Sequence, residues 1–130
     1  MAATYLDSSA IVKLVVEEAE STALRTYLRR RRPFVSSALA RTEVLRALVP
    51  AGDEAVAVGR RTLARLDLVR ISDRVLSTAA TLPPEALRSL DAIHLATVAH
   101  LGRDLGVVVT YDDRMAVAAR LQGHRVASPR

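Results

Sequence analysis

Short runs of β-branched and aliphatic residues alternate along the chain with longer segments whose apolar residues recur every three or four positions. The short runs predict strands at 3–7, 33–37, 68–72, 105–112 and 124–128. The segments between them predict helices at 9–18, 20–32, 38–49, 53–66, 73–82, 89–102 and 113–122. This strand–helix alternation predicts an α/β fold of three layers, with a parallel sheet covered by helices on both faces.

Some element ends are less sharply defined by the pattern. The first helix has Ser8 or Ser9 as its N-cap, and the helix that ends near residue 102 begins at Glu85 or at Ser89. The valine run in "LGVVVTYD", residues 105–112, is typical of a strand that is buried on both faces.

One carboxylate interrupts the apolar pattern. In "SLDAIHLATVAHLG", residues 89–102, Asp91 lies on the same helical stripe as His94, Leu95 and Val98. A carboxylate where a core begins is costly unless something pairs with it. Its simplest role is to stabilise the first turn of the helix through the helix dipole. The alternative explanation is that Asp91 belongs to a binding site.

The composition narrows the class of protein. With 130 residues, half of them apolar, the chain is expected to form one globular domain over residues 1–130. The absence of cysteine excludes a disulfide framework and suits a reducing, cytoplasmic location. The longest uncharged stretch, residues 92–102, is shorter than the roughly 20 residues that span a bilayer, and Asp7 argues against a signal peptide. The net charge of +5 permits a polyanionic partner.

Two further aspartates stand where predicted strands end. Asp7 directly follows the first strand, and Asp112 closes the strand at 105–112. Either one can simply cap the next helix. Glu43 lies inside a predicted helix on the face of Leu39 and Ala47, where it can also be a solvated rim residue. In a parallel sheet, however, sites form beyond the carboxyl ends of the strands, so these acids and Asp91 can meet at one edge.

Four converging carboxylates repel one another and need compensation. A hard divalent cation bound by oxygen ligands, Mg²⁺ or Mn²⁺, provides it. Zinc is a poor candidate, because the chain has no cysteine and only three scattered histidines, at positions 94, 100 and 124.

Four segments together resemble a known family. "YLDSSAIVKL" at the start, the helical glutamate of "RTEVLRAL", "LDAIHLATVAHLG", and "VVTYDDRMAVAARLQGHRV" resemble the PIN domain, and specifically the VapC toxins of toxin–antitoxin pairs. The resemblance runs in order over essentially the whole chain. It implies a five-stranded, mostly parallel sheet in the order 3-2-1-4-5, which sets the first and fourth strands side by side.

The resemblance also implies a function. It points to an endoribonuclease dependent on Mg²⁺ or Mn²⁺, with Asp7, Glu43, Asp91 and Asp112 as the acidic residues. Asp7, Asp91 and Asp112 are the expected metal ligands, and Glu43 either binds metal or orients the attacking water. Ser9 and Thr110 fall on the family's hydroxyl positions and are expected to fix carboxylates or to touch phosphate.

The expected partners are an RNA substrate, a VapB-like antitoxin and a second copy of the chain. The alternative is a catalytically silent PIN-like module that only binds RNA or a protein.

Three details complete the sequence prediction. Alternation along a strand puts Thr110 and Asp112 on one side and Asp113 on the other, which favours Asp112 over its neighbour. His94 lies on an apolar stripe and is expected to be a packed, hydrogen-bonded residue rather than a general base. The run Arg29–Arg32 either guides RNA phosphates or is simply solvated.

Two other acid-rich α/β classes do not suit the sequence. A response-regulator receiver needs an acceptor aspartate after its third strand and a lysine after its fifth, but Lys13 is the sole lysine. A haloacid-dehalogenase-type phosphatase needs an aspartate two residues after the first, where this chain has Ser9.

Overall fold

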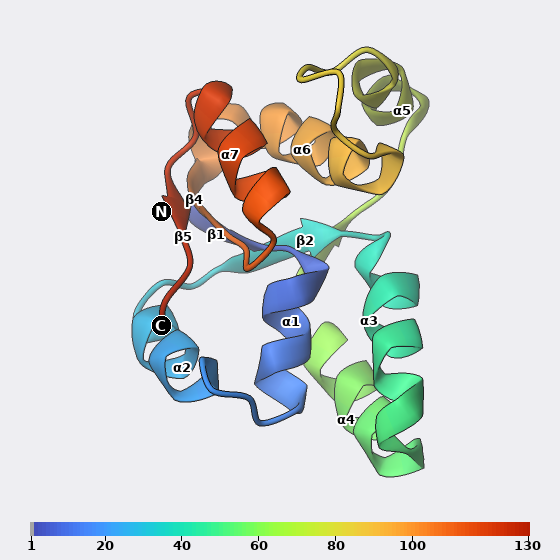
Figure 1. Cartoon of the computed structure of the whole chain (residues 1–130), viewed down its shortest axis with the longest axis vertical. Coiled ribbons are helices and arrows are strands. Elements are labelled where there is room, and N and C mark those ends of the chain that lie inside the picture. The colour runs from blue at the N-terminus through green and yellow to red at the C-terminus, as the bar shows by residue number, and fades with distance from the viewer. Residues whose placement is uncertain (1) are drawn as a thin grey trace.

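The computed structural model describes residues 2–130, in which five parallel strands form one sheet in the order β3-β2-β1-β4-β5 (Figure 1). The strands are β1 (Ala3–Leu6), β2 (Phe34–Ser37), β3 (Asp67–Val69), β4 (Leu105–Val109) and β5 (Val126–Ala127). The expected strand order and the parallel arrangement are therefore confirmed. In this order β1 lies between β2 and β4, so the first and fourth strands are neighbours.

Helices cover both faces of the sheet (Figure 1). One face carries α1 (Ser8–Val15), α2 (Ser21–Leu28), α3 (Ala40–Leu48) and α4 (Asp53–Leu63). The other carries α5 (Asp73–Ala80), α6 (Ser89–Leu101) and α7 (Asp113–Leu121). Two short 3₁₀ turns follow α3 and α6, at Val49–Ala51 and Gly102–Asp104. The three-layer α/β architecture is confirmed.

The alternation of side chains along the strands divides the core into two halves. Tyr5 and Val108 point toward α6 and α7, where they pack with buried residues such as Leu95. Leu6 and Val109, the next residue along each strand, pack on the opposite face with the residues of α1 to α4. Both halves are apolar, as the valine run predicts for a strand buried on both faces.

Several element ends differ from the sequence prediction. The N-cap of α1 is Asp7, whose carboxylate accepts a hydrogen bond from the Ala10 N–H at 3.0 Å, so neither Ser8 nor Ser9 is the cap. β4 ends at Val109, and α6 begins at Ser89, the later of its two expected starts. The third strand covers residues 67–69 rather than 68–72.

The arginine run 29–32 lies outside the helix in which it was predicted. α2 ends at Leu28, and Arg30 has a positive φ of 66°, which is incompatible with a continuing right-handed helix. Arg31 turns back over the ring of Tyr27, with its guanidinium carbon 4.0 Å from the ring centroid. The run therefore forms an irregular connection into β2.

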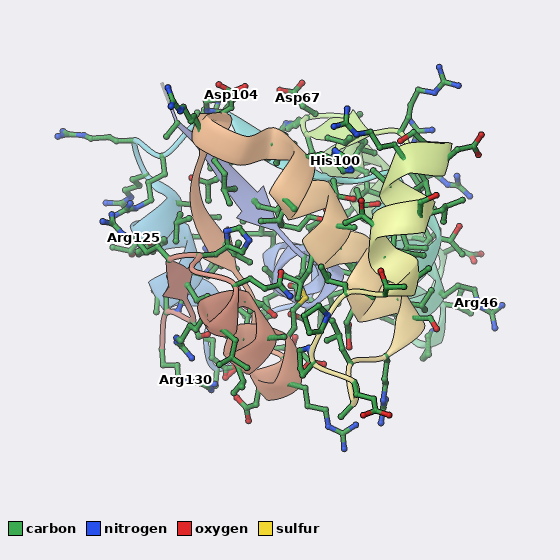
Figure 2. The ribbon with its side chains drawn as sticks, turned by 90° about the horizontal axis from the view of Figure 1, so that it is seen from above. Arg46, Asp67, His100, Asp104, Arg125 and Arg130 are labelled. Carbon is green, nitrogen blue, oxygen red and sulfur yellow. The ribbon has the colours of Figure 1, made fainter. Side chains whose placement is uncertain are left out.

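Charged side chains such as Arg46, Arg125 and Arg130 project outward around the periphery (Figure 2). Within residues 2–130, no helix combines the length and the apolar character that a membrane crossing requires.

Candidate active site

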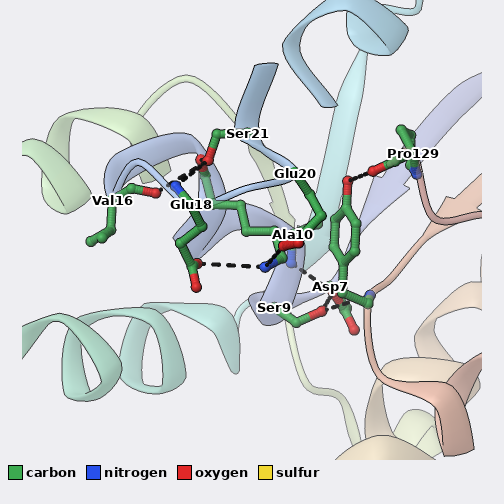
Figure 3. Close-up of polar contacts among 10 residues, drawn as sticks. Asp7, Ser9, Ala10, Val16, Glu18, Glu20, Ser21 and Pro129 are labelled. Atoms are coloured by element: carbon green, nitrogen blue, oxygen red, sulfur yellow. Dashed lines mark hydrogen bonds and ion pairs between the residues drawn. The ribbon is translucent and has the colours of Figure 1, made fainter. Parts of the chain in front are cut away.

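Asp7 is placed at the carboxyl edge of the sheet by the turn from β1 into α1. Its side chain is only 4% exposed, yet it has three hydrogen-bond donors. The Ser9 hydroxyl and the Ala10 N–H donate to Oδ1, at 2.6 and 3.0 Å (Figure 3). The Thr110 hydroxyl donates to Oδ2. Burial raises the pKa of Asp7, and the hydrogen bonds from Ser9 and Thr110 offset that rise only in part.

Ser9 and Thr110 also connect the two central strand ends. The Tyr111 N–H donates to the Ser9 hydroxyl at 3.0 Å, and the Asp112 N–H donates to the Thr110 hydroxyl at 3.1 Å. Each hydroxyl thus accepts a backbone hydrogen bond from the β4–α7 connection and donates to Asp7. The two residues fix the carboxylate, which is the first of the two roles that the sequence predicts for them.

Glu43 extends from α3 toward the same edge and is held by two donors. The Ser8 hydroxyl donates to Oε1 at 2.6 Å, and His94 Nε2 lies 2.6 Å from the same oxygen. Partial burial acts to raise the pKa of Glu43, but the hydrogen bonds from His94 and Ser8 outweigh it and lower the pKa. These contacts therefore favour the ionised form of Glu43.

His94 is a buried residue of α6 with both ring nitrogens engaged. Besides Glu43 at Nε2, it has the Tyr5 hydroxyl 2.6 Å from Nδ1. This agrees with the prediction of a packed, hydrogen-bonded histidine. The contacts with Tyr5 and Glu43 themselves have no signal in the sequence, because they join three elements that only the fold brings together.

Burial and the charges of the other three acids raise the pKa of Asp91. It is half-buried at the start of α6, and burial and then the charge of Asp112 raise its pKa, with smaller contributions from Asp7 and Glu43. The four predicted acids thus reach one edge of the sheet from β1, α3, α6 and the start of α7.

Asp112 is positioned by a cap rather than by a strand. It is the N-cap of α7, and its Oδ1 accepts from the Met115 N–H at 3.0 Å. Because β4 ends at Val109, the strand alternation that favoured Asp112 over Asp113 does not extend to these residues. What distinguishes them is their electrostatic effect on Asp91: burial and then the charge of Asp112 raise the pKa of Asp91, and Asp113 is not among the groups that shift it.

Two arginines beside the acids were missed by the sequence analysis. Asp91, Asp112 and Asp113 line a depression of about 210 Å³ together with Arg88 and Arg114. Arg88 is the N-cap residue of α6, and Arg114 is the second residue of α7. The signal was available, because each arginine is within three residues of a predicted acid.

The donor set suits a hard divalent cation. It consists of carboxylates, with serine and threonine hydroxyls behind them, and its mutual repulsion is what a cation relieves. In the described part of the chain, no group of three or more histidine, cysteine, aspartate or glutamate side chains is arranged so that it could hold a metal ion. One oxygen of Asp112 caps α7, and both oxygens of Asp7 accept from donors of the protein.

The arginine run lines a separate surface. Arg29, Arg30 and Arg32 border a groove of about 1130 Å³ with Arg25 and Arg65. The groove lies where β2 and β3 begin, whereas the acids lie where β1 ends. The run therefore stands at the opposite edge of the sheet from the acidic site.

A parallel sheet in this order, with acids at its carboxyl edge, defines the class of protein. The family model of the PIN domain matches residues 4–121, so the chain belongs to the PIN-domain family.

Within that family, the chain is similar to VapC ribonucleases of Mycobacterium tuberculosis. It is 62% identical to Ribonuclease VapC46 over 129 residues, covering 99% of both chains. It is 43% identical to Ribonuclease VapC35 over 129 residues, covering 96% of both.

Solved structures show the same fold. VapC20 of Mycobacterium tuberculosis, a toxin that cleaves the sarcin–ricin loop, superposes with a TM-score of 0.75 at 14% identity, over 88% of this chain and 94% of that one. A toxin–antitoxin complex from Klebsiella pneumoniae gives 0.74 at 23% identity, over 98% of both chains.

Proposed function

We propose that the protein is a VapC-type endoribonuclease that hydrolyses RNA phosphodiester bonds with a divalent cation, Mg²⁺ or Mn²⁺. The observation that carries this proposal is the gathering of acids at the carboxyl edge of the sheet: Asp91 and Asp112 line one depression, and burial and the charges of Asp112, Asp7 and Glu43 raise the pKa of Asp91. Ribonucleases of this family generally depend on a divalent metal. Residues 1–130 act in this proposal as one PIN domain.

Each acid has a role in this proposal. Asp7, Asp91 and Asp112 hold the cation, and Glu43 either joins them or orients the attacking water. A bound divalent cation supplies Lewis acidity, which acidifies water and neutralises charge on the non-bridging phosphate oxygens. Ser9 and Thr110 keep the Asp7 carboxylate in place by donating to its two oxygens. Arg88 and Arg114 contribute positive charge beside the acids and attract the RNA backbone.

The same proposal includes partners. We expect neutralisation by a VapB-like antitoxin, in keeping with the solved toxin–antitoxin complex of the same fold. We also expect a homodimer and a cytoplasmic location, where cellular RNA is the substrate. An exposed apolar pair on α7, Val117 and Leu121, offers a surface for the second copy, at 54% and 71% exposure.

The direct test is cleavage of total cellular RNA by the purified protein. Cleavage at discrete sites with Mg²⁺ or Mn²⁺, and none with EDTA, is the expected result. Glu43→Gln and Asp91→Asn should each lower the rate by orders of magnitude while leaving the fold intact. RNA binding without cleavage, under every divalent ion tried, would instead identify the silent binding module.

A further inference from the structure

We infer that Tyr5 and His94 are positioning residues for Glu43: the Tyr5 hydroxyl donates to His94 Nδ1, and His94 Nε2–H in turn donates to Glu43 Oε1. These three residues form what we name the Tyr5 chain. Its geometry stands on the structure alone, while its effect on cleavage rests on the proposed function, in which Glu43 serves the reaction.

The Tyr5 chain joins three elements through two short contacts. Tyr5 belongs to β1, His94 to α6 and Glu43 to α3, and the two contacts are each 2.6 Å. Tyr5 is completely buried and His94 is 2% exposed, whereas the Glu43 side chain is 23% exposed. The Tyr5 chain therefore runs from the interior of the protein to the edge of the acidic site.

The chemistry of the end groups sets the direction of the hydrogen bonds. Near pH 7 a glutamate, whose ordinary pKa is about 4.3, is ionised and can only accept, so the nitrogen 2.6 Å from its Oε1 must carry a hydrogen. The Tyr5 hydroxyl carries a hydrogen, since burial and then the charge of Asp7 raise its pKa far above the ordinary value. Both demands are met when His94 is neutral, with its hydrogen on Nε2 and a lone pair on Nδ1. A charged imidazolium would leave the Tyr5 hydrogen without an acceptor on His94.

Ser36 does not change this assignment. Its hydroxyl is close enough to Tyr5 to favour ionisation of the tyrosine, but no partner of Ser36 Oγ lies within hydrogen-bond limits among the described residues. The short contact with His94 is the stronger of the two and decides the orientation of the Tyr5 hydroxyl.

The consequence for Glu43 is that its two carboxylate oxygens differ in the hydrogen bonds that they accept. Oε1 receives both His94 Nε2–H and the Ser8 hydroxyl, while Oε2 has no hydrogen bond from the described residues. A glutamate side chain on a helix surface ordinarily samples several rotamers, and two donors on one oxygen restrict it to one. Oε2 is then the oxygen presented to water or to a ligand. His94 cannot serve as a general base in this state, because its Nε2 already carries the hydrogen and the lone pair of its Nδ1 accepts from the buried Tyr5 hydroxyl.

The tautomer is tested by NMR on the full-length protein, without metal and without RNA. Long-range proton–nitrogen spectra of ¹⁵N-labelled protein near pH 7 should show His94 Nδ1 unprotonated and Nε2 protonated. In Tyr5→Phe the donor to Nδ1 is gone, and the His94 nitrogen shifts should move toward a mixture of states. A hydrogen on Nδ1 of wild-type His94, or on both nitrogens, overturns the inference.

Substitutions of His94 separate positioning from packing. His94→Gln keeps an N–H that can reach Glu43, whereas His94→Leu keeps apolar bulk but no donor. We expect His94→Leu and Tyr5→Phe to lower kcat by about tenfold or more, with KM nearly unchanged, and His94→Gln to retain most of the rate. Equal rates for His94→Leu and His94→Gln would contradict positioning.

Thr97→Val is the matched control. Thr97 lies one turn beyond His94 on α6, is completely buried, and donates to the Ile93 carbonyl outside the Tyr5 chain. Loss of this hydroxyl should leave both kcat and the His94 spectrum unchanged; a shift as large as that of Tyr5→Phe would contradict the inference. If wild type cuts no RNA, the proposed function fails while the spectrum still decides the tautomer. The wrong tautomer in an active enzyme refutes the Tyr5 chain alone.

Discussion

The Thr110 hydroxyl donates to Asp7 across 103 residues of sequence. The contact is possible because β1 and β4 are neighbours, so that the two strands end side by side at the same edge of the sheet. It gives the buried carboxylate a donor that its own segment does not supply. The strand order of the fold thus brings Thr110 within hydrogen-bond distance of Asp7, the most buried acid in the site.

Thr110→Val tests this relationship. Removal of the hydroxyl leaves a buried carboxylate oxygen without its donor, which costs about 1–3 kcal/mol of unfolding free energy. We also expect slower cleavage, because Asp7 loses part of what opposes the burial-induced rise of its pKa. Urea unfolding and cleavage rates measure the two effects. Thr110→Ser, which restores the hydroxyl, should behave nearly as wild type; if Thr110→Val does so as well, the contact is unimportant.

The neighbouring acids Asp112 and Asp113 should respond differently to the same substitution. Asparagine caps a helix about as well as aspartate, and it removes the charge that opposes Asp91, so Asp112→Asn should melt no lower than wild type in EDTA and yet lose cleavage. Asp113→Asn should keep much more of the rate. Asp112→Ala, which removes the cap, should additionally lose about 1 kcal/mol of stability. Equal loss of cleavage in the two asparagine variants would show that Asp113 shares the work.

The two groups of arginines are expected to contribute unequally to RNA binding. Arg88 and Arg114 lie beside the acids, whereas Arg29 and Arg30 lie in the groove at the opposite edge. The double variant R88Q/R114Q should weaken RNA binding and flatten its salt dependence, by about 0.7 in log–log slope for each phosphate that the variant no longer neutralises. R29Q/R30Q removes the same charge and should change the slope less. Titrations in EDTA measure both, and the reverse order would place RNA along the groove.

The apolar pair on α7 predicts a concentration-dependent oligomer. Val117 and Leu121 are one helical turn apart, so V117S/L121S removes a contiguous apolar surface without touching the core. Light scattering coupled to gel filtration should show a dimer for wild type and a monomer for the double variant. An unchanged dimer would move the interface elsewhere.

The sequence predicts the framework of this protein better than its polar interior. Strands and helices follow from apolar periodicity. The positions of Asp7, Asp91 and Asp112 follow from where predicted strands and helices begin or end, and that of Glu43 follows from the face of its helix. The Tyr5 chain could not be predicted, because Tyr5 reads as a strand residue and His94 as part of an apolar stripe. Nothing local indicates that a hydroxyl of β1 meets a ring of α6. The same holds for Arg30, whose positive φ breaks an otherwise regular helical pattern.

Asp91→Asn gives the strongest test of the acidic site, because it should affect stability and activity in opposite directions. Burial, Asp112 and the other acids raise the pKa of Asp91, so the folded protein binds this proton more tightly than the unfolded chain does. Metal-free wild type should therefore lose stability as pH rises from the ordinary aspartate pKa through the raised one. Above that range the ionised carboxylate is unfavourable, and Asp91→Asn should raise the melting temperature. At acid pH, where Asp91 is protonated in wild type, the difference should disappear.

Divalent metal should stabilise wild type more than the variant. Mg²⁺ at a hundred times its dissociation constant stabilises wild type by about 2.7 kcal/mol, and Asp91→Asn should gain less because it has lost a ligand. If Asp91 only stabilised the helix dipole, its replacement would instead cost about 0.3–1 kcal/mol. Mg²⁺ would then hardly move either melting curve. Thermal melts of both proteins at neutral pH, in EDTA and in Mg²⁺, distinguish these accounts, since only a shared metal site makes the variant the more stable protein in EDTA and the less responsive one in Mg²⁺.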